Sequence, residues 1–237
     1  DILKLADNSL ADGTVPVGDD RYVTNGPKKG YVYLCNVRKD NPGSMVNGPW
    51  MSSDSKTWNF LKKVTVDGSV SWRQAAFSAT VSGLSRILKT NSLPINHTTG
   101  VFPVARTDDA SKYDPNPNTI SAQNITKALT ADPAYSETPY CMGGEVGIML
   151  TGVALFNGFD AGLRDAQAHE LQDDCDGHPQ GSGEYHYHGL SKCIKDATYK
   201  TVIGYAYDGF PITGPMVTKD TYLTTDDLDE CHGITSE

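Results

Sequence analysis

The sequence predicts a mainly β protein: a single β-sandwich or barrel-like domain with long loops and one or two short helices. Three observations favour this class. Short runs of β-branched and aromatic residues recur along the chain, 23 glycines and 13 prolines imply many turns, and helical patterning is confined to two segments. At 237 residues, of which 38% are hydrophobic, the chain is long enough to bury a sizeable core.

The predicted strands either alternate apolar with polar residues or form apolar runs bounded by Gly, Pro and Asn. Residues 63–66 and 69–72 alternate in this way and are joined by Asp67-Gly68, a dipeptide typical of two-residue turns, so they predict a β-hairpin. The remaining predicted strands are residues 31–37, 78–82, 146–156 and 201–207.

Two segments have helical patterning. Residues 163–171, with Ala166 and Ala168 inside them, are the better candidate, and residues 120–129 are the weaker one. Residues 113–118 contain two prolines together with Asn and Asp, so irregular structure is predicted there. The sequence has no internal repeat, linker or shift in composition, which favours one domain.

The charge and hydropathy of the chain exclude two classes of partner. The formal net charge is -9, and the sequence has no cluster of Lys and Arg of the kind that phosphate contacts require, so no nucleic-acid partner is expected. No window approaches the roughly 18 apolar residues of a membrane span, so none is predicted. An acidic surface suits cations instead.

Cysteine usage and two glycosylation sequences indicate the compartment. None of the five cysteines lies in a Cys-x-x-Cys motif, so disulfides are their natural use, and one cysteine must be left over. Asn96 and Asn124 each begin an Asn-x-Thr acceptor sequence in a polar, turn-rich neighbourhood. These features favour a secreted protein, either extracellular or held at the cell surface.

Histidines are crowded into one part of the chain. In the run Tyr185-His186-Tyr187-His188, the strand period of two places both imidazoles on one face, about 7 Å apart along the strand. His178 lies eight residues before His186 across a glycine-rich connection, so it could fold back as a third ligand, with His169 as a possible fourth. Imidazoles suit copper and zinc, so we predict a transition-metal site; the alternative is that these histidines are simply hydrogen-bonded core or surface residues.

Acidic residues are the candidates for acid–base chemistry. Glu170, next to His169, and Asp208, further along the chain, are both considered as a general base. Residues 169–173 begin like the His-Glu-x-x-His helix of zinc proteases, but the second histidine is missing. Gly-x-Ser-x-Gly and the nucleotide-binding glycine motifs are also absent, so nucleophilic and nucleotide chemistry have no support.

Several separated motifs carry a family resemblance. The main segments are residues 168–178, 184–189 and 203–212, and the second of these contains the tetrad Tyr-His-Tyr-His. Shorter matching motifs lie upstream at residues 48–50, 66–72, 99–103, 113–118 and 147–153. Together they resemble the YHYH-domain family, which implies a secreted domain over residues 31–237 after an N-terminal extension at residues 1–30. The resemblance implies no particular reaction.

The resemblance also implies how the cysteines are used, pairing Cys35 with Cys141 and Cys175 with Cys193. In similar proteins the stretch that resembles residues 227–233 is followed by another Tyr-His-Tyr-His-like strand and a further cysteine, whereas this sequence ends at residue 237. We therefore expect the domain to lack its C-terminal end. We also expect Cys231 to be bonded outside residues 1–237, to a downstream cysteine or to another chain in a homo- or hetero-assembly.

Three functions are compatible with these observations. The first is a secreted, disulfide-bonded metal-binding module of an extracellular assembly or matrix. The second is a metal-dependent extracellular hydrolase or oxidoreductase that uses zinc or copper. The number of protein ligands distinguishes this function from the first, because catalytic metal sites keep an open coordination position. The third is a carbohydrate-binding domain with Trp50, Trp58 or Trp72 as its platform, although aromatic residues of this kind are more often part of the core.

Overall fold

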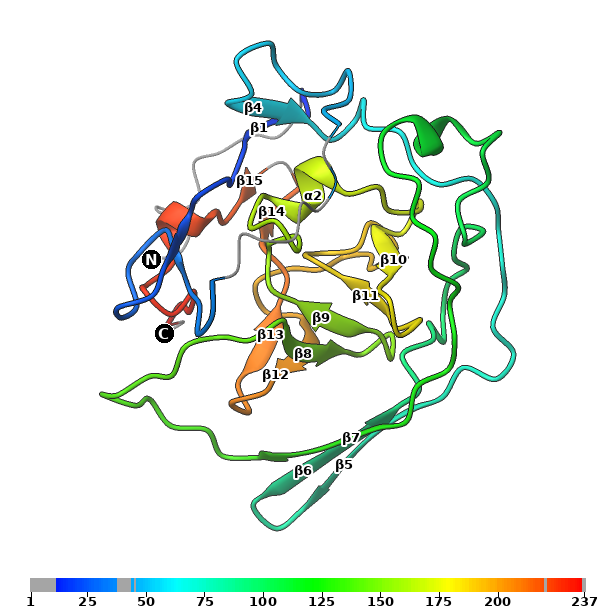
Figure 1. The fold of residues 1–237 in the computed structure, drawn as a ribbon. Coiled ribbons are helices and arrows are strands. Elements are labelled where there is room, and N and C mark those ends of the chain that lie inside the picture. Colours follow the sequence, from blue (N-terminus) through cyan, green and yellow to red (C-terminus); the bar gives the residue numbers. More distant parts are fainter. Residues whose placement is uncertain (1–11, 38–43, 45, 220, 236–237) are drawn as a thin grey trace.

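The computed structural model describes residues 12–37, 44, 46–219 and 221–235 of the chain (Figure 1). The mainly β class with long loops is confirmed, and the described strands form open sheets rather than a closed barrel. The described helices are two short 3₁₀ segments and one α-helical turn: η1 (Asp109–Lys112), α2 (Ala166–His169) and η2 (Thr225–Asp227).

The largest sheet has six strands in the order β10-β11-β9-β8-β12-β13. The bounds of these strands are β8 (Glu145–Met149), β9 (Ala154–Phe156), β10 (Gly177–Pro179), β11 (Tyr185–Tyr187), β12 (Val202–Ala206) and β13 (Pro211–Thr213). All neighbours pair antiparallel except β11 and β9, which run parallel. Because β10 and β11 form one edge, the histidine-rich segment lies at the side of this sheet (Figure 1).

A second, three-stranded antiparallel sheet is formed by β5 (Phe77–Ser82), β6 (Ser85–Thr90) and β7 (Ile125–Thr130). Leu88 and Leu129 of this sheet pack with Ile148 of β8, and Tyr205 and Tyr207 cover the contact. The β5–β7 sheet therefore packs partly against the six-stranded sheet, and the rest of its hairpin extends away from the main body (Figure 1).

Three two-stranded pairs complete the described structure. They are β1 (Thr14–Pro16) with β4 (Thr57–Asn59), β2 (Tyr22–Val23) with β3 (Val32–Tyr33), and β14 (Met216–Thr218) with β15 (Thr221–Tyr222). The strands of the N-terminal 30 residues thus pair with strands that follow residue 30.

The main core lies under the tyrosine face of β11. Tyr185 and Tyr187 are both 0% exposed and pack in one cluster with Trp50, Leu93 and Leu171. Alternate residues of a strand point to opposite faces, so burying these two rings in the core turns His186 toward the other face.

Some of the predicted elements are correct. Residues 78–82 and 201–207 correspond to β5 and β12, and residues 113–118 are irregular. Residues 31–37 contribute only β3, and residues 163–171 only the single turn α2.

Other predictions are wrong. Residues 63–72 do not form a hairpin: Val66 is bridged to Asp173 and Val70 to Thr99, so each half pairs with a distant segment. Residues 146–156 form two strands, since Gly152 adopts a positive φ of 86° and lets the chain turn between β8 and β9. Residues 120–129 are not helical, because their second half pairs with β6 as β7.

Candidate metal site

The three histidines of the predicted site are brought together by one hairpin. β10 and β11 pair so that His178 lies directly opposite His186, and the centroids of the two rings are 4.6 Å apart. His188 follows two residues after His186 on the same face, and the Nε2 atoms of these two rings are 3.1 Å apart. One ligand atom from each of the three residues lies within 4.8 Å of those of the other two.

A disulfide joins the two ends of the segment that carries these histidines. Cys175 is bonded to Cys193, 18 residues later, and a second disulfide joins Cys35 to Cys141. Both pairs are those that the family resemblance implies. The cross-link between Cys175 and Cys193 therefore encloses all three histidines in one covalent loop.

Glu170 completes the cluster from the other side. It is the C-cap of the single helical turn α2, and its backbone leaves the helix in an extended conformation. Its Oε2 atom is 3.2 Å from Nε2 of His188 and 3.5 Å from Nε2 of His178. The side chains of His178 and His188 are each 5% exposed and that of Glu170 is 16% exposed, so the donor atoms face one another in a nearly closed space.

The outer ring nitrogens of two histidines are held by backbone carbonyls. Nδ1 of His186 lies 3.1 Å from the Glu184 oxygen, and Nδ1 of His188 lies 2.6 Å from the Asn157 oxygen. Asn157 directly follows β9, the strand that pairs in parallel with β11. A carbonyl oxygen only accepts hydrogen bonds, so each Nδ1 carries a proton, and the neutral form of either ring has its bare lone pair on Nε2.

Several atoms of the cluster have no hydrogen-bond partner. Among the residues that the structure describes, nothing hydrogen-bonds to Glu170 Oε2 or to either ring nitrogen of His178, although all three atoms are buried. Buried polar atoms without a partner are rare, because their desolvation is then uncompensated. Phe156 stacks on His186 with ring centroids 4.0 Å apart and helps to keep water away.

Burial also sets the charge state of the rings. It lowers the pKa of His186 to about 3, with a further contribution from neighbouring His188. Burial, followed by the two neighbouring histidines, likewise lowers the pKa of His178 well below its ordinary value. Both rings are therefore neutral at physiological pH, which is the form of imidazole that binds metals.

The tyrosines of the tetrad have a different role on the opposite face. Tyr185 donates its hydroxyl to the buried carboxylate of Asp173 at 2.9 Å. The Tyr187 hydroxyl lies 2.5 Å from Nε2 of His97, whose Nδ1 faces a carbonyl, and 3.3 Å from the Thr151 hydroxyl. Burial raises the pKa of both tyrosines, so both remain protonated donors in the core.

Two candidate residues lie outside the cluster. His169 is buried, but its Nε2 contacts both carboxylate oxygens of Asp19 at 3.1 Å rather than the other histidines. Asp208 is exposed in the turn between β12 and β13, where its carboxylate accepts the Phe210 N–H, and its charge contributes to the raised pKa of the Cys231 thiol. Asp208 is therefore near Cys231.

Residues proposed for other roles are distributed as follows. Asn96 and Asn124 are exposed, and Cys231 is exposed and is the free cysteine of the described residues. Trp50 and Trp58 are 3% and 8% exposed and belong to the core, so neither offers a platform for a sugar. Trp72 is partly buried against the same core, and its indole N–H donates to Thr99.

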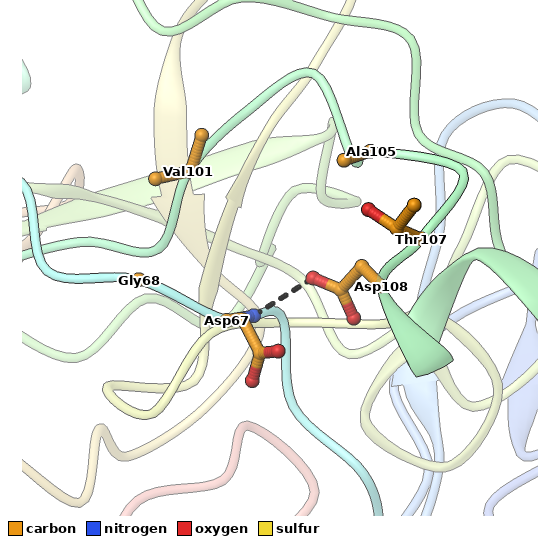
Figure 2. A pocket seen from close by; sticks show the side chains of 6 residues that line it. All are labelled: Asp67, Gly68, Val101, Ala105, Thr107 and Asp108. Carbon is orange, nitrogen blue, oxygen red and sulfur yellow. Dashed lines mark hydrogen bonds between the residues drawn. The ribbon is translucent and has the colours of Figure 1, made fainter.

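Two other features do not offer a comparable site. His97 lies near the sulfur atoms of Cys175 and Cys193, but both sulfurs are already bonded to each other. Figure 2 shows a pocket beside Asp67 and Asp108, in which the Asp108 carboxylate accepts the backbone N–H of Asp67 at 2.9 Å. The Asp67 carboxylate points away from that hydrogen bond, so the two acids do not converge (Figure 2).

Sequence reasoning missed the position of Glu170. The sequence makes its carboxylate a candidate base, and the structure places its Oε2 atom 3.2 Å from Nε2 of His188 and 3.5 Å from Nε2 of His178. The signal available in the sequence was only its closeness to the histidine-rich segment. No pattern indicated that the turn after α2 would fold back over the hairpin.

Comparisons with known proteins agree with the tetrad. Residues 126–225 match the model of a family described as YHYH protein. No curated protein and no solved structure matches the chain significantly. In the described part of the chain, every helix is too short to cross a membrane. The matched range contains the histidine hairpin, Glu170 and the Cys175–Cys193 disulfide, and over residues 126–225 the match confirms the resemblance to the YHYH family.

Proposed function

We propose that this chain is a secreted module of an extracellular assembly or matrix, in which His178, His186, His188 and Glu170 hold one zinc or copper ion. The ion serves a structural role: it joins the β10–β11 hairpin to the turn after α2. The two disulfides and the YHYH domain support an extracellular setting, because disulfides persist in oxidising compartments.

The observation that carries the proposal is the pair of imidazole nitrogens facing each other. With both Nδ1 atoms bound to carbonyls, the lone pairs of His186 and His188 converge at 3.1 Å, which is repulsive unless a cation lies between them. A single proton on His188 would satisfy His186 and Glu170, but it would leave His178 without a partner. A metal ion gives one donor atom of each of the four groups a partner.

The separations between the donors also suit a tetrahedral ion. Metal–ligand bonds of about 2.0–2.1 Å at tetrahedral angles place neighbouring donors roughly 3.3–3.4 Å apart. Three of the six separations among the Nε2 and Oε2 atoms are 3.1, 3.2 and 3.5 Å, and one ligand atom of each histidine lies within 4.8 Å of those of the other two. Small movements of the side chains are therefore enough to accommodate the ion.

The donor set favours a structural site over the catalytic alternative. Three imidazoles and one carboxylate fill four positions, and they lie almost entirely away from solvent. Catalytic zinc sites have three protein ligands and a position open to water. The hydrogen bonds from Nδ1 to carbonyl oxygens are also typical of metal-binding histidines, whose orientation they fix.

The test is elemental analysis of the full chain, secreted without a histidine tag. We expect about one equivalent of zinc or copper per chain in the natural protein and a near-complete loss in His186→Ala. The matched control is His232→Asn, which removes a histidine outside the cluster; Asn suits this position because its φ is 60°. A natural protein that holds no metal after growth and refolding with either ion would refute the proposal.

A further inference from the structure

We propose that Lys63 is a positioning residue for the metal site, because its side-chain amine holds the turn that carries Glu170. This inference rests on the proposed function. It adds a residue that is distant in sequence from the histidine hairpin and that touches none of its imidazoles by any described hydrogen bond.

The contacts of Lys63 are made with the end of the helical turn. Its Nζ atom donates to the backbone oxygen of Gln167, to that of Glu170 at 2.6 Å, and to the side-chain oxygen of Gln172 at 2.5 Å. The Gln172 side chain in turn donates to the Ala166 oxygen at 3.0 Å. Carbonyls at the C-terminal end of a helix lack partners within the helix, and a lysine amine is well suited to bind them.

The three acceptors match the three N–H donors of the ammonium form of Lys63, although burial lowers the pKa of this amine to about 7. All three are uncharged oxygens, and each needs a separate N–H, which only the ammonium form supplies in that number. Part of the Lys63 residue remains exposed while its amine is directed inward. The amine therefore acts as a polar cap on the turn rather than as one half of a surface ion pair.

Lys63 is itself placed by the pairing that replaces the expected hairpin. The Val66 N–H donates to the Gln172 oxygen at 2.9 Å, and the Thr65 hydroxyl donates to the Asp174 carboxylate at 2.6 Å. Residues 63–66 thus run alongside residues 170–174. This pairing brings Lys63 next to the Glu170 backbone.

Glu170 depends on this support because its own side chain is held by little else. Among the described residues, no group hydrogen-bonds to its buried Oε2 atom, which faces only the imidazoles. The direction of the carboxylate is therefore set by the backbone of residue 170, and Lys63 binds the oxygen of that residue. Loss of the amine would let the carboxylate move away from the ion.

A double-mutant cycle tests this coupling. The affinity of the full chain for Zn²⁺ alone is measured by competition with a chromophoric chelator, for the natural protein, Lys63→Met, Glu170→Ala and the double variant. Methionine keeps the apolar stem but has no donor. We expect Lys63→Met to weaken zinc binding by about 10–100-fold, as is usual when the support of a ligand is removed.

The cycle separates positioning from a general structural role. If Lys63 acts through Glu170, Lys63→Met has no further effect once Glu170 is alanine; an equal loss in both backgrounds overturns the proposal. Lys62→Met, at the exposed neighbouring position, is the matched control and keeps the natural affinity.

Two further outcomes are defined in advance. If Lys63→Met does not fold, Lys63→Arg replaces it in the same cycle. Arginine keeps a cation with several donors, so the zinc affinity of this variant should lie closer to the natural value. The absence of any coupling between Lys63→Arg and Glu170→Ala overturns the proposal. If the natural protein binds no zinc, the proposed function fails. Natural zinc binding that Lys63→Met leaves unchanged overturns only the role of Lys63.

Discussion

Strand β11 has two chemically different faces, and a pair of substitutions tests the role of each face separately. Tyr187→Phe removes one hydroxyl from the core and leaves His97 Nε2 and the 3% exposed Thr151 hydroxyl without that partner. Leaving buried polar groups unsatisfied costs about 1–3 kcal/mol. In a chain of this size each kcal/mol corresponds to about 2–4 °C, so we expect Tm to fall by roughly 2–12 °C with the metal content unchanged.

His188→Ala, one residue further along, has the opposite signature. It removes a ligand from the metal face, so we expect the bound ion to be lost while the hydrogen bonds of the tyrosine face persist. The assays are elemental analysis and thermal unfolding with and without a chelator, with Tyr140→Phe as the control because Tyr140 is 90% exposed. Equal loss of metal from Tyr187→Phe and His188→Ala would refute the assignment of the two faces.

Three further predictions concern pH and the cysteines. In the metal-free protein the folded-state pKa of His186 is lowered from 6.5 to about 3, and that of His178 is also lowered. The unfolded chain therefore binds more protons in acid, and the free energy of unfolding falls as the pH drops below 6.5. Urea unfolding that gives the same free energy at pH 7.5 and pH 5.5 would contradict this. Replacing both Cys175 and Cys193 with alanine opens a loop of 18 residues, so the free energy of unfolding, measured with a denaturant, should fall by about 3 kcal/mol. Peptide mapping that links Cys175 to Cys141 would rule out the pairing. Cys231 should be bonded outside residues 1–237, so either the native mass exceeds 25.6 kDa plus glycans or reduction releases a disulfide-linked partner chain, whereas a free Cys231 thiol in the natural protein would count against this.

The tetrad strand could be predicted from sequence because its information is local. Alternation of Tyr with His is enough to place the imidazoles on one face, and the seven residues between His178 and His186 are enough for a hairpin to bring those two residues opposite each other. The disulfide pairs followed from the family resemblance and not from spacing.

The absence of the expected hairpin at residues 63–72 shows why other parts of the fold could not be predicted from the sequence. Gly68 does adopt a positive φ of 112°, but residues 67 and 68 form no turn, and the flanking residues pair with segments far along the chain. Val66 pairs with residue 173 and is 1% exposed, so burial in the core outweighed the local turn preference. The same long-range pairing positions Lys63 and Glu170, which explains why their roles could not be read from sequence.

The donors of the proposed site are close together along the chain, since Glu170 and His188 are only 18 residues apart. The carbonyl that orients His188 comes from Asn157, 31 residues away, and the full sheet needs strands from more distant parts of the chain. Short loops close at a lower entropic cost and therefore form early in folding. We expect the ion to be captured while the chain is still folding and then enclosed, so that the metal found in the mature protein records the compartment of synthesis rather than the ions present outside the cell.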